Sequence, residues 1–185
     1  MEYIPLETLC QEDLHCLIIP KDGIPVSNLI IYPTRFTVGS SRSYNINVNV
    51  LRSPTGAKIG IGMNEALQSA MRNLDTLMKK RAQEAFSNRP YRSFVNQDSS
   101  FVFFDLKCHP TCLDVEVFDD DNDETQLFGF WTLEKKLNHK CLNNAFLLFD
   151  FPCFFVEQGE VCCNPRLLKL SYFEEEEGFP KAFSI

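Results

Sequence analysis

The residues most able to do chemistry are cysteines and histidines in the second half of the chain. Cys108, His109 and Cys112 lie close together, and His139 and Cys141 follow further along the chain. Thiolate sulfur and imidazole nitrogen are the usual ligands of tetrahedral zinc, and close cysteine pairs with about two intervening residues are common in such sites. This pair has three intervening residues. We therefore expect ordinary cysteines here, with a zinc site as the weaker alternative.

Catalysis by a thiol is a second possibility, because the chain has eight cysteines and three histidines. A cysteine nucleophile needs a base, an orienting group and a donor for the developing oxyanion, and no motif in this sequence supplies that set. Gly60-Ile-Gly62 lacks the further glycines and the lysine of a phosphate-binding loop. We expect a protein that is not an enzyme and that needs no cofactor. The absence of a signal peptide favours reduced thiols over a disulfide framework.

Basic residues are concentrated between Arg35 and Arg92, although the whole chain has a formal net charge of −7. That net charge argues against nucleic acid as the partner. A local cluster of cations is a candidate contact surface for anionic lipid headgroups or for an acidic partner, and a solvated helix face is the competing interpretation. The residues of this candidate basic surface are Arg72, Lys79, Lys80, Arg81, Arg89 and Arg92, with Arg35, Arg42 and Lys58 as further candidates.

Most of those cations belong to a segment with helical periodicity, residues 63–87. Its apolar side chains recur every three or four positions, which predicts one long amphipathic helix that buries one face. Asn64 is the expected N-cap, and Asn88-Arg89-Pro90 is the expected stop. We expect this to be the only helix in the chain.

The rest of the chain alternates in the manner of strands. Residues 45–51 and 113–118 place apolar side chains on one face and mostly polar ones on the other, residues 101–106 form a further apolar strand, and more strands are expected at residues 127–133, 146–149 and 167–173. Five acids crowd positions 119–124. Because so many like charges cannot share a packed interior, they predict an exposed loop that joins two strands of a hairpin.

This strand, acidic loop and strand resemble the second half of a C2 domain, a β-sandwich found in many membrane-associated signalling proteins. The matching motifs are Leu113 to Asp121, Leu127-Phe128-Gly129, Gly159-Glu160 and Leu168 to Tyr172. Asn28 to Pro33 and Tyr44 to Val50 are similar to the lipid-binding C2-like region of DOCK-family exchange factors. Together with the number of expected strands, the resemblance implies a mainly β fold, an antiparallel two-sheet β-sandwich. The one long inserted amphipathic helix at 63–87 departs from the family's pattern. We expect a lead-in segment at residues 1–25 and a single C2-like domain at residues 26–185.

The resemblance also suggests testing whether the family's calcium ligands are present in this sequence. Asp119 and Asp121 match acids of the family's second calcium loop, but Gln126 stands where a further acid is expected. The partner loop, near residues 53–57, has no acid, and calcium needs six to eight oxygen ligands. A complete calcium site is therefore not expected, and Asp119, Asp121 and Asp123 remain candidates for weak calcium binding only.

These observations predict a non-enzymatic binding module that is recruited to anionic phospholipid membranes largely without calcium. The alternative is a protein–protein adaptor, or a host-factor-binding β-sandwich, without lipid affinity. The most apolar run, residues 145–156, is interrupted by Asp150 and Pro152 and is too short to span a bilayer. We expect a cytoplasmic protein, membrane-associated when recruited, with no transmembrane segment.

Overall fold

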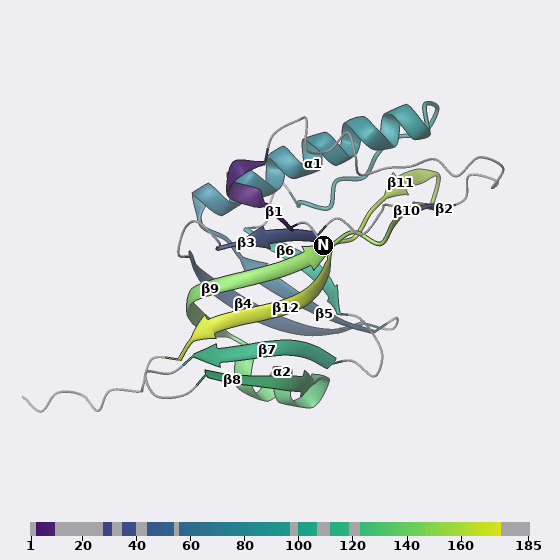
Figure 1. Cartoon of the computed structure of the whole chain (residues 1–185). Coiled ribbons are helices and arrows are strands. Elements are labelled where there is room, and N and C mark those ends of the chain that lie inside the picture. The colour runs from purple at the N-terminus through teal and green to yellow at the C-terminus, as the bar shows by residue number, and fades with distance from the viewer. Residues whose placement is uncertain are drawn as a thin grey trace, which may run out of the picture.

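The computed structural model describes residues 3–9, 28–30, 35–39, 44–53, 56–96, 100–106, 112–118 and 123–174. Within them the fold is mainly β (Figure 1). Its helical elements are η1 (Leu6–Thr8), α1 (Glu65–Ala85) and α2 (Phe130–Leu137). Its strands are β1 (Tyr3–Pro5), β2 (Asn28–Ile30), β3 (Arg35–Val38), β4 (Tyr44–Ser53), β5 (Gly56–Gly62), β6 (Phe101–Leu106), β7 (Cys112–Phe118), β8 (Asp123–Gly129), β9 (Lys140–Asp150), β10 (Cys153–Glu157), β11 (Glu160–Cys162) and β12 (Arg166–Phe173).

Five of these strands close into a barrel. β4 pairs with β5, β5 pairs with β6, and β9 pairs with β4, all antiparallel. β12 completes the ring, because it runs antiparallel to β9 along one edge and parallel to the end of β6 along the other. The prediction of a mainly β protein is confirmed, but the prediction of a two-sheet sandwich is wrong. The sheet returns on itself through β12, so its two halves are hydrogen-bonded to each other instead of merely packed face to face.

The barrel is extended at both sides. Beyond the end of β6, β7 pairs in parallel with the rest of β12, and on its other edge β7 pairs antiparallel with β8. This β7–β8 pair confirms the predicted hairpin, although its acidic tip at 119–122 lies outside the described residues. On the other side, β3 adds to β9 and β1 adds to β3 in parallel. A separate small sheet of β11, β10 and β2 projects beyond the barrel (Figure 1).

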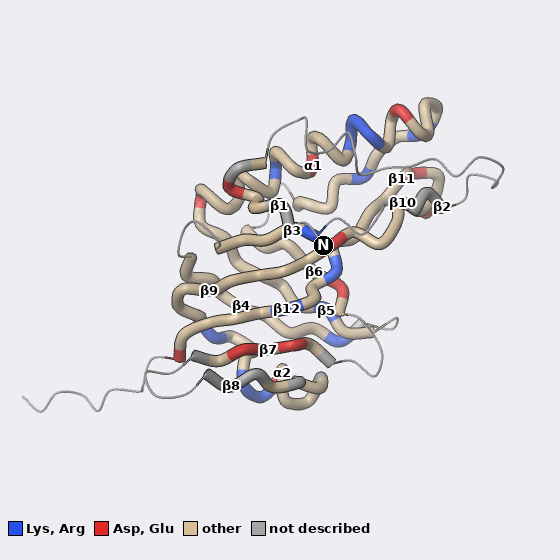
Figure 2. The backbone as a smooth tube through the Cα atoms, in the orientation of Figure 1, with Lys and Arg blue, Asp and Glu red and all other residues tan. Residues whose placement is uncertain are grey.

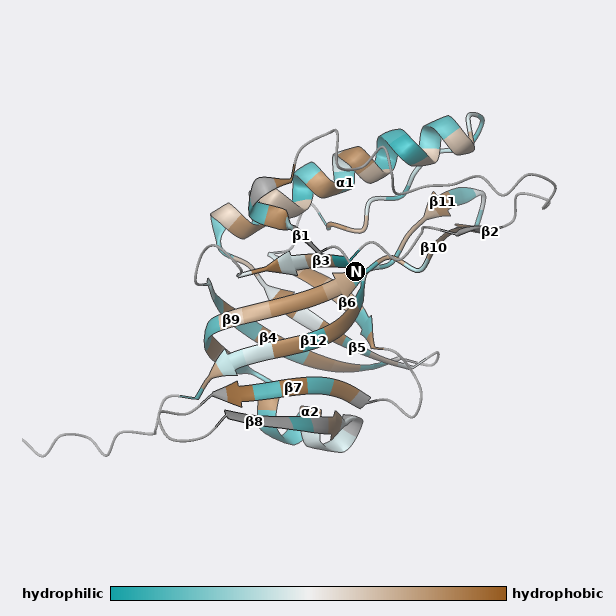
Figure 3. Ribbon diagram, viewed as in Figure 1, coloured by the Kyte–Doolittle hydropathy of each residue, from teal (hydrophilic) through white to brown (hydrophobic). Residues whose placement is uncertain are grey.

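The core lies inside the ring and is closed at both ends by helices. Inward residues of neighbouring strands, such as Ile59, Phe104 and Phe149, are fully buried, and the rings of Phe104 and Phe149 meet at 5.3 Å. α1 crosses above the barrel and α2 lies below it (Figure 1). Figure 3 shows hydrophobic residues along the barrel strands and mostly hydrophilic ones on the outward side of α1.

The predicted helix at 63–87 is confirmed as α1. The Asn64 side chain accepts a hydrogen bond from the backbone N–H of Leu67, which satisfies one of the free donors of the first turn. Leu67, Met71, Leu74, Met78 and Ala82 form its buried stripe. Within the described residues, no helix is both long enough and apolar enough to cross a bilayer.

The expectation of only one helix is wrong. Residues 127–133 were expected to form one strand, but β8 ends at Gly129 and α2 begins at Phe130. Leu133 and Leu137 are fully buried, one turn apart on the face that covers the lower end of the barrel. Two buried positions in an eight-residue helix are too few to establish a period, so strand and helix could not be told apart from the sequence here.

Candidate functional site

The outward surface of β5 and β6 combines two glycines with two aromatic rings. Gly60 and Gly62 are the cross-strand partners of Phe103 and Phe101. A Cβ added to Gly60 would lie 2.8 Å from Phe103 Cε1, and one added to Gly62 would lie 3.1 Å from Phe101 Cε1. The two rings therefore lie over the glycine backbone, in space that any side chain on β5 would occupy. Such pairing of a cross-strand aromatic with a glycine also supports the strand where it lacks a side chain of its own.

The side chains of Phe101 and Phe103 point away from the core. Val102, Phe104 and Leu106 point inward and are buried, whereas Phe103 is 38% exposed and Phe101 is half-buried. The strand thus has aromatic residues on both faces: one face packs in the core, and the other covers the glycines of β5 while part of its ring surface stays in contact with solvent.

β4 continues the same surface with amides. Its inward residues are apolar, and its outward residues include Asn45, Asn47 and Asn49. Asn47 lies opposite Gly62, and Asn49 lies opposite Gly60. The carbonyl and amino groups of an Asn side chain can each hydrogen-bond a polar ligand. We call the surface made by Asn47, Asn49, Gly60, Gly62, Phe101 and Phe103 the outer aromatic face.

His139 connects this face to the end of α2. Its backbone N–H donates to Val48 O at 2.8 Å, and its Nδ1 lies 3.0 Å from Asn49 Oδ1. The neighbouring Asn138 side chain accepts from the backbone N–H of Val50 at 2.8 Å. These contacts continue along β4 beyond Val48, where β9 no longer pairs with it.

Charges are sparse on this side of the barrel. Lys58 lies two residues before Gly60, in the same outward phase of β5, and forms an ion pair with Asp105 at 3.4 Å. Arg52, at the end of β4, pairs with Glu134 of α2 at 3.4 Å. Lys140, the first residue of β9, is exposed. Arg52 and Lys140 are the cross-strand partners of the inward residues Ala57 and Val48, so of these three cations Lys58 is the one on the outer aromatic face, and Asp105 partly offsets it.

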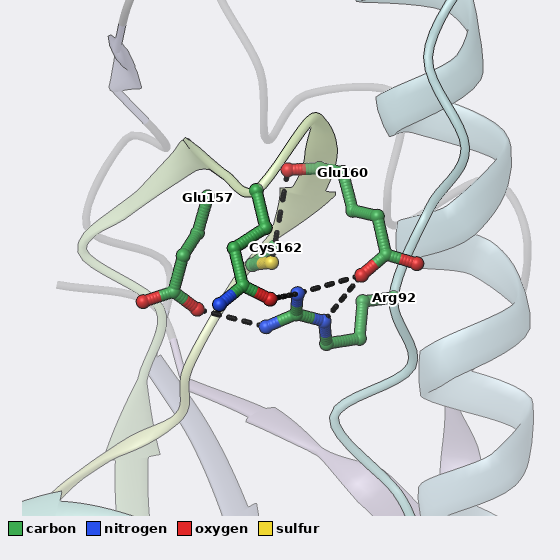
Figure 4. A network of polar contacts seen from close by, with 5 residues as sticks. Arg92, Glu157, Glu160 and Cys162 are labelled. Atoms are coloured by element: carbon green, nitrogen blue, oxygen red, sulfur yellow. Dashed lines mark hydrogen bonds and ion pairs between the residues drawn. The ribbon is translucent and has the colours of Figure 1, made fainter.

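The β10–β11 hairpin is held in place by an arginine from the segment after α1 (Figure 4). Arg92 donates from Nε to Glu160 at 2.6 Å and from Nη1 to Glu157 at 2.8 Å. The hydrogen bonds that Arg92 donates to Glu160 and Glu157 raise the pKa of its guanidinium group. Arg92 N–H also donates to Val161 O, and Val161 N–H donates to Pro90 O. The hairpin and the segment that follows α1 therefore form one connected unit.

The candidate basic surface is not a single contact surface in the structure. Arg72, Lys79, Lys80 and Arg89 are exposed, the first three of them along α1 (Figure 2). Arg81 is paired with Glu84 at 2.7 Å, and Arg92 is engaged by the two glutamates of the hairpin. The acid that offsets Arg81 is one turn away on the same helix, whereas those that offset Arg92 come from a hairpin more than 60 residues later in the chain.

The metal-binding predictions fall largely on residues outside the description. Asp119, Asp121, Cys108 and His109 are outside it, and only the backbone of Asp123 is described, in β8. Within the described segments, no group of three or more His, Cys, Asp or Glu side chains could hold a metal ion.

Three thiols lie together near the small sheet, and their environment disfavours the thiolate. Burial raises the pKa of Cys153 and Cys162, and it raises that of Cys163 to about 12. The Cys163 Sγ lies 3.3 Å from the Tyr91 hydroxyl. A nucleophilic cysteine needs a lowered pKa, so none of these three is prepared for covalent catalysis.

Sequence reasoning missed the outer aromatic face, although two signals were available. Residues 101–106 carry phenylalanine in both phases of a strand, and residues 56–62 carry glycine at alternate positions. The local sequence suggests comparing Gly60 and Gly62 only with a phosphate-binding loop. Their role in making room for the phenyl rings depends on β6 lying beside β5, and the local pattern does not show which strands pair.

Comparison with known proteins finds likeness in structure only. No family model matches the sequence, and no curated protein matches it. One similar solved structure is a C-terminal truncation of the single-stranded DNA-binding protein from bacteriophage Enc34, with a TM-score of 0.50 and 8% identity, covering 88% of this chain and 98% of that one. The untruncated phage protein aligns with a TM-score of 0.47 and 9% identity, over 91% of this chain and 96% of that one. The likeness to the truncated protein shows a shared small β-barrel of the OB-like type.

The barrel and its structural neighbour overturn the predicted C2 domain and its DOCK-like branch. The predicted recruitment to anionic phospholipid rested on that family assignment and is wrong, as is the adaptor alternative built on a β-sandwich. The prediction, made from the net charge, that nucleic acid is not a partner is also wrong. A sum over the whole chain says little about one face of a barrel that presents aromatic rings and amides.

Proposed function

We propose that this protein binds single-stranded DNA, without catalysing a reaction, on its outer aromatic face. The observation that carries the proposal is the pair of outward rings, Phe101 and Phe103, lying over Gly62 and Gly60. The bases of a single strand expose flat apolar faces that need a flat apolar partner. Every base has such a face, so the rings would bind without strong sequence preference.

The position of these rings in the barrel supports the same conclusion. β4, β5 and β6 are the first three strands of the ring, and β9 and β12 are the fourth and fifth. In OB-folds the face of the second and third strands is the surface that binds oligonucleotides. Here those strands are β5 and β6, which carry the glycines and the phenylalanines. The truncated phage protein with this fold is named as a single-stranded DNA-binding protein, which supports the proposal at the level of the fold.

The surrounding groups would contact the rest of the strand. Asn47 and Asn49 offer donors and acceptors to base edges or sugars. Lys58 lies on the face and would contact a phosphate, and Lys140 is exposed at the start of β9 as a second, more distant candidate. With so few cations, stacking would supply most of the affinity, and the dependence on salt would be shallow. One to two neutralised phosphates correspond to a slope of roughly −0.7 to −1.4 in a plot of log K against log salt.

The test is a fluorescence-anisotropy titration with a labelled oligothymidine, comparing the wild type with Phe103→Ala and Phe101→Ala. Each substitution should weaken binding by about 1–3 kcal/mol, the usual value of one base stacked on an aromatic ring. Phe173→Ala is the matched control, because Phe173 is 47% exposed on β12, across the barrel from β5. It should bind as the wild type does.

Two results would contradict the proposal. One is unchanged affinity in both the Phe101 and the Phe103 variants. The other is equal affinity of the wild type for the single strand and for its duplex, since stacked base pairs hide the faces that the rings would contact.

A further inference from the structure

The outward side of α2 carries the most exposed large apolar side chain in the described residues. Trp131 is 73% exposed, at the start of the helix. Lys135 follows one helical turn later and is also exposed, so the two side chains lie on one face. Leu133 and Leu137 are buried on the opposite face. An aromatic ring and a cation thus share a surface that packing does not require.

The neighbouring charges leave this stripe cationic. Glu134 is turned to Arg52, with which it forms an ion pair. Lys136 lies over the Phe128 ring, 5.2 Å from its centroid, and so belongs to a different side of the helix. Of the two lysines, Lys135 is the one on the Trp131 face, and the charge of Glu134, which is also a neighbour of Trp131, is offset by Arg52.

The C-terminal end of α2 meets the outer aromatic face. α2 ends at Leu137, and His139 then reaches Asn49 Oδ1 on that face. Phe103 is two strand spacings from Asn49, about 10 Å. The eight residues of α2 extend about 12 Å further. A strand crossing β6, β5 and β4 in turn would arrive at the end of α2.

We infer that bound single-stranded DNA leaves the outer aromatic face across β4 and continues along α2. There Trp131 stacks on a base and Lys135 contacts a phosphate. This inference rests on the proposed function and adds a second stacking point to it, well outside the β5–β6 surface. The number of nucleotides that the protein binds would then depend on α2 as well as on the barrel.

Intrinsic fluorescence tests this directly, because Trp131 is the single tryptophan of the chain. An oligothymidine of about 12 nucleotides should quench its emission, whereas one of about four nucleotides should bind the outer aromatic face without quenching it. Trp131→Ala should weaken binding of the longer oligonucleotide at least about fivefold and leave the shorter one unchanged. Trp131→Phe should restore most of the lost affinity.

The lysines supply a matched pair. Lys135→Gln should reduce the magnitude of the salt slope for the longer oligonucleotide by about 0.7, the value of one phosphate contact. Lys136→Gln should leave the slope unchanged, because Lys136 lies over Phe128.

Failure of this inference is distinguishable from failure of the proposed function. If Phe103→Ala weakens binding while Trp131 is neither quenched nor needed, the strand does not reach α2. If Phe101→Ala and Phe103→Ala are both without effect, the proposed function itself fails. Trp131 emission that changes with protein concentration in the absence of DNA, together with a larger species in sedimentation, would show that a second copy covers α2 and would overturn the inference.

Discussion

Gly60 should control DNA binding without controlling stability, and Gly60→Ala separates the two. The added Cβ would lie 2.8 Å from Phe103 Cε1 and 3.1 Å from Phe103 Cδ1, whereas the nearest backbone atom, Asn49 O, is 3.6 Å away. The obstacle is therefore one side chain, and Phe103 is exposed enough to swing outward. The methyl group should displace the ring and leave the strand in place.

The two contributions to stability nearly cancel. Moving a ring from its preferred rotamer costs about 0.5–1.5 kcal/mol, and replacing glycine within a strand recovers about 0.5–1 kcal/mol of backbone entropy. We expect the free energy of unfolding of Gly60→Ala to stay within about 1 kcal/mol of the wild type. Binding should weaken at least about fivefold, because the displaced ring no longer presents its flat face over β5.

Urea denaturation and anisotropy titration of the same samples measure both quantities. Gly129→Ala is the control, because a Cβ at Gly129 meets nothing within 4 Å; it should bind as the wild type does. If Gly60→Ala keeps full affinity while Phe103→Ala loses it, the glycine does not position the ring. A loss of several kcal/mol of stability would show instead that the ring is fixed by packing.

Two further predictions concern stability. Burial raises the pKa of Cys163 to about 12 from an ordinary value of 9.0, so the unfolded chain loses this proton first as the pH rises. The contribution of Cys163 to the free energy of unfolding should be constant below about pH 9 and should fall by up to about 1.4 kcal/mol per pH unit between pH 9 and 12. Cys163→Ala should show a shallower decline in urea titrations. Burial also raises the pKa of Tyr91, which contacts Cys163, and of Tyr172, and both contribute to the remaining decline above pH 10. Arg166 donates to the buried Asp150 at 2.8 and 2.6 Å, so Arg166→Met should lower the free energy of unfolding by about 3–5 kcal/mol; a loss below 1 kcal/mol would mean that water replaces the arginine.

The low charge of the proposed DNA surface distinguishes it from binding surfaces that depend on counterion release. Arg92 and Arg81 belong to the most basic part of the sequence, yet each is paired with glutamate within the fold. Lys58 is partly offset by Asp105. Affinity that depends on Phe101 and Phe103 would persist at salt concentrations that weaken purely electrostatic binding.

Local patterns determined the elements whose partners are close in the chain. The α1 helix follows from the spacing of Leu67 to Ala82 and from the Asn64 cap, because both act within a few residues. The β7–β8 hairpin follows in the same way from alternation on either side of an acidic segment. These features depend on the chain's own periodicity and on the cost of burying like charges.

Tertiary structure alone decided whether the sheet stays open or closes. Alternating strands bury one face in a sandwich and in a barrel alike, so their pattern is the same in both. Closure depends on β12 pairing with β6, about 60 residues earlier, through Arg166–Asp105 and Leu167–Leu106. The outer aromatic face has the same origin, because the Phe103 ring lies over the backbone only where Gly60 is placed beside it. Sequence determines which side chains exist and which way they alternate, whereas strand pairing over long separations decides what each of them faces.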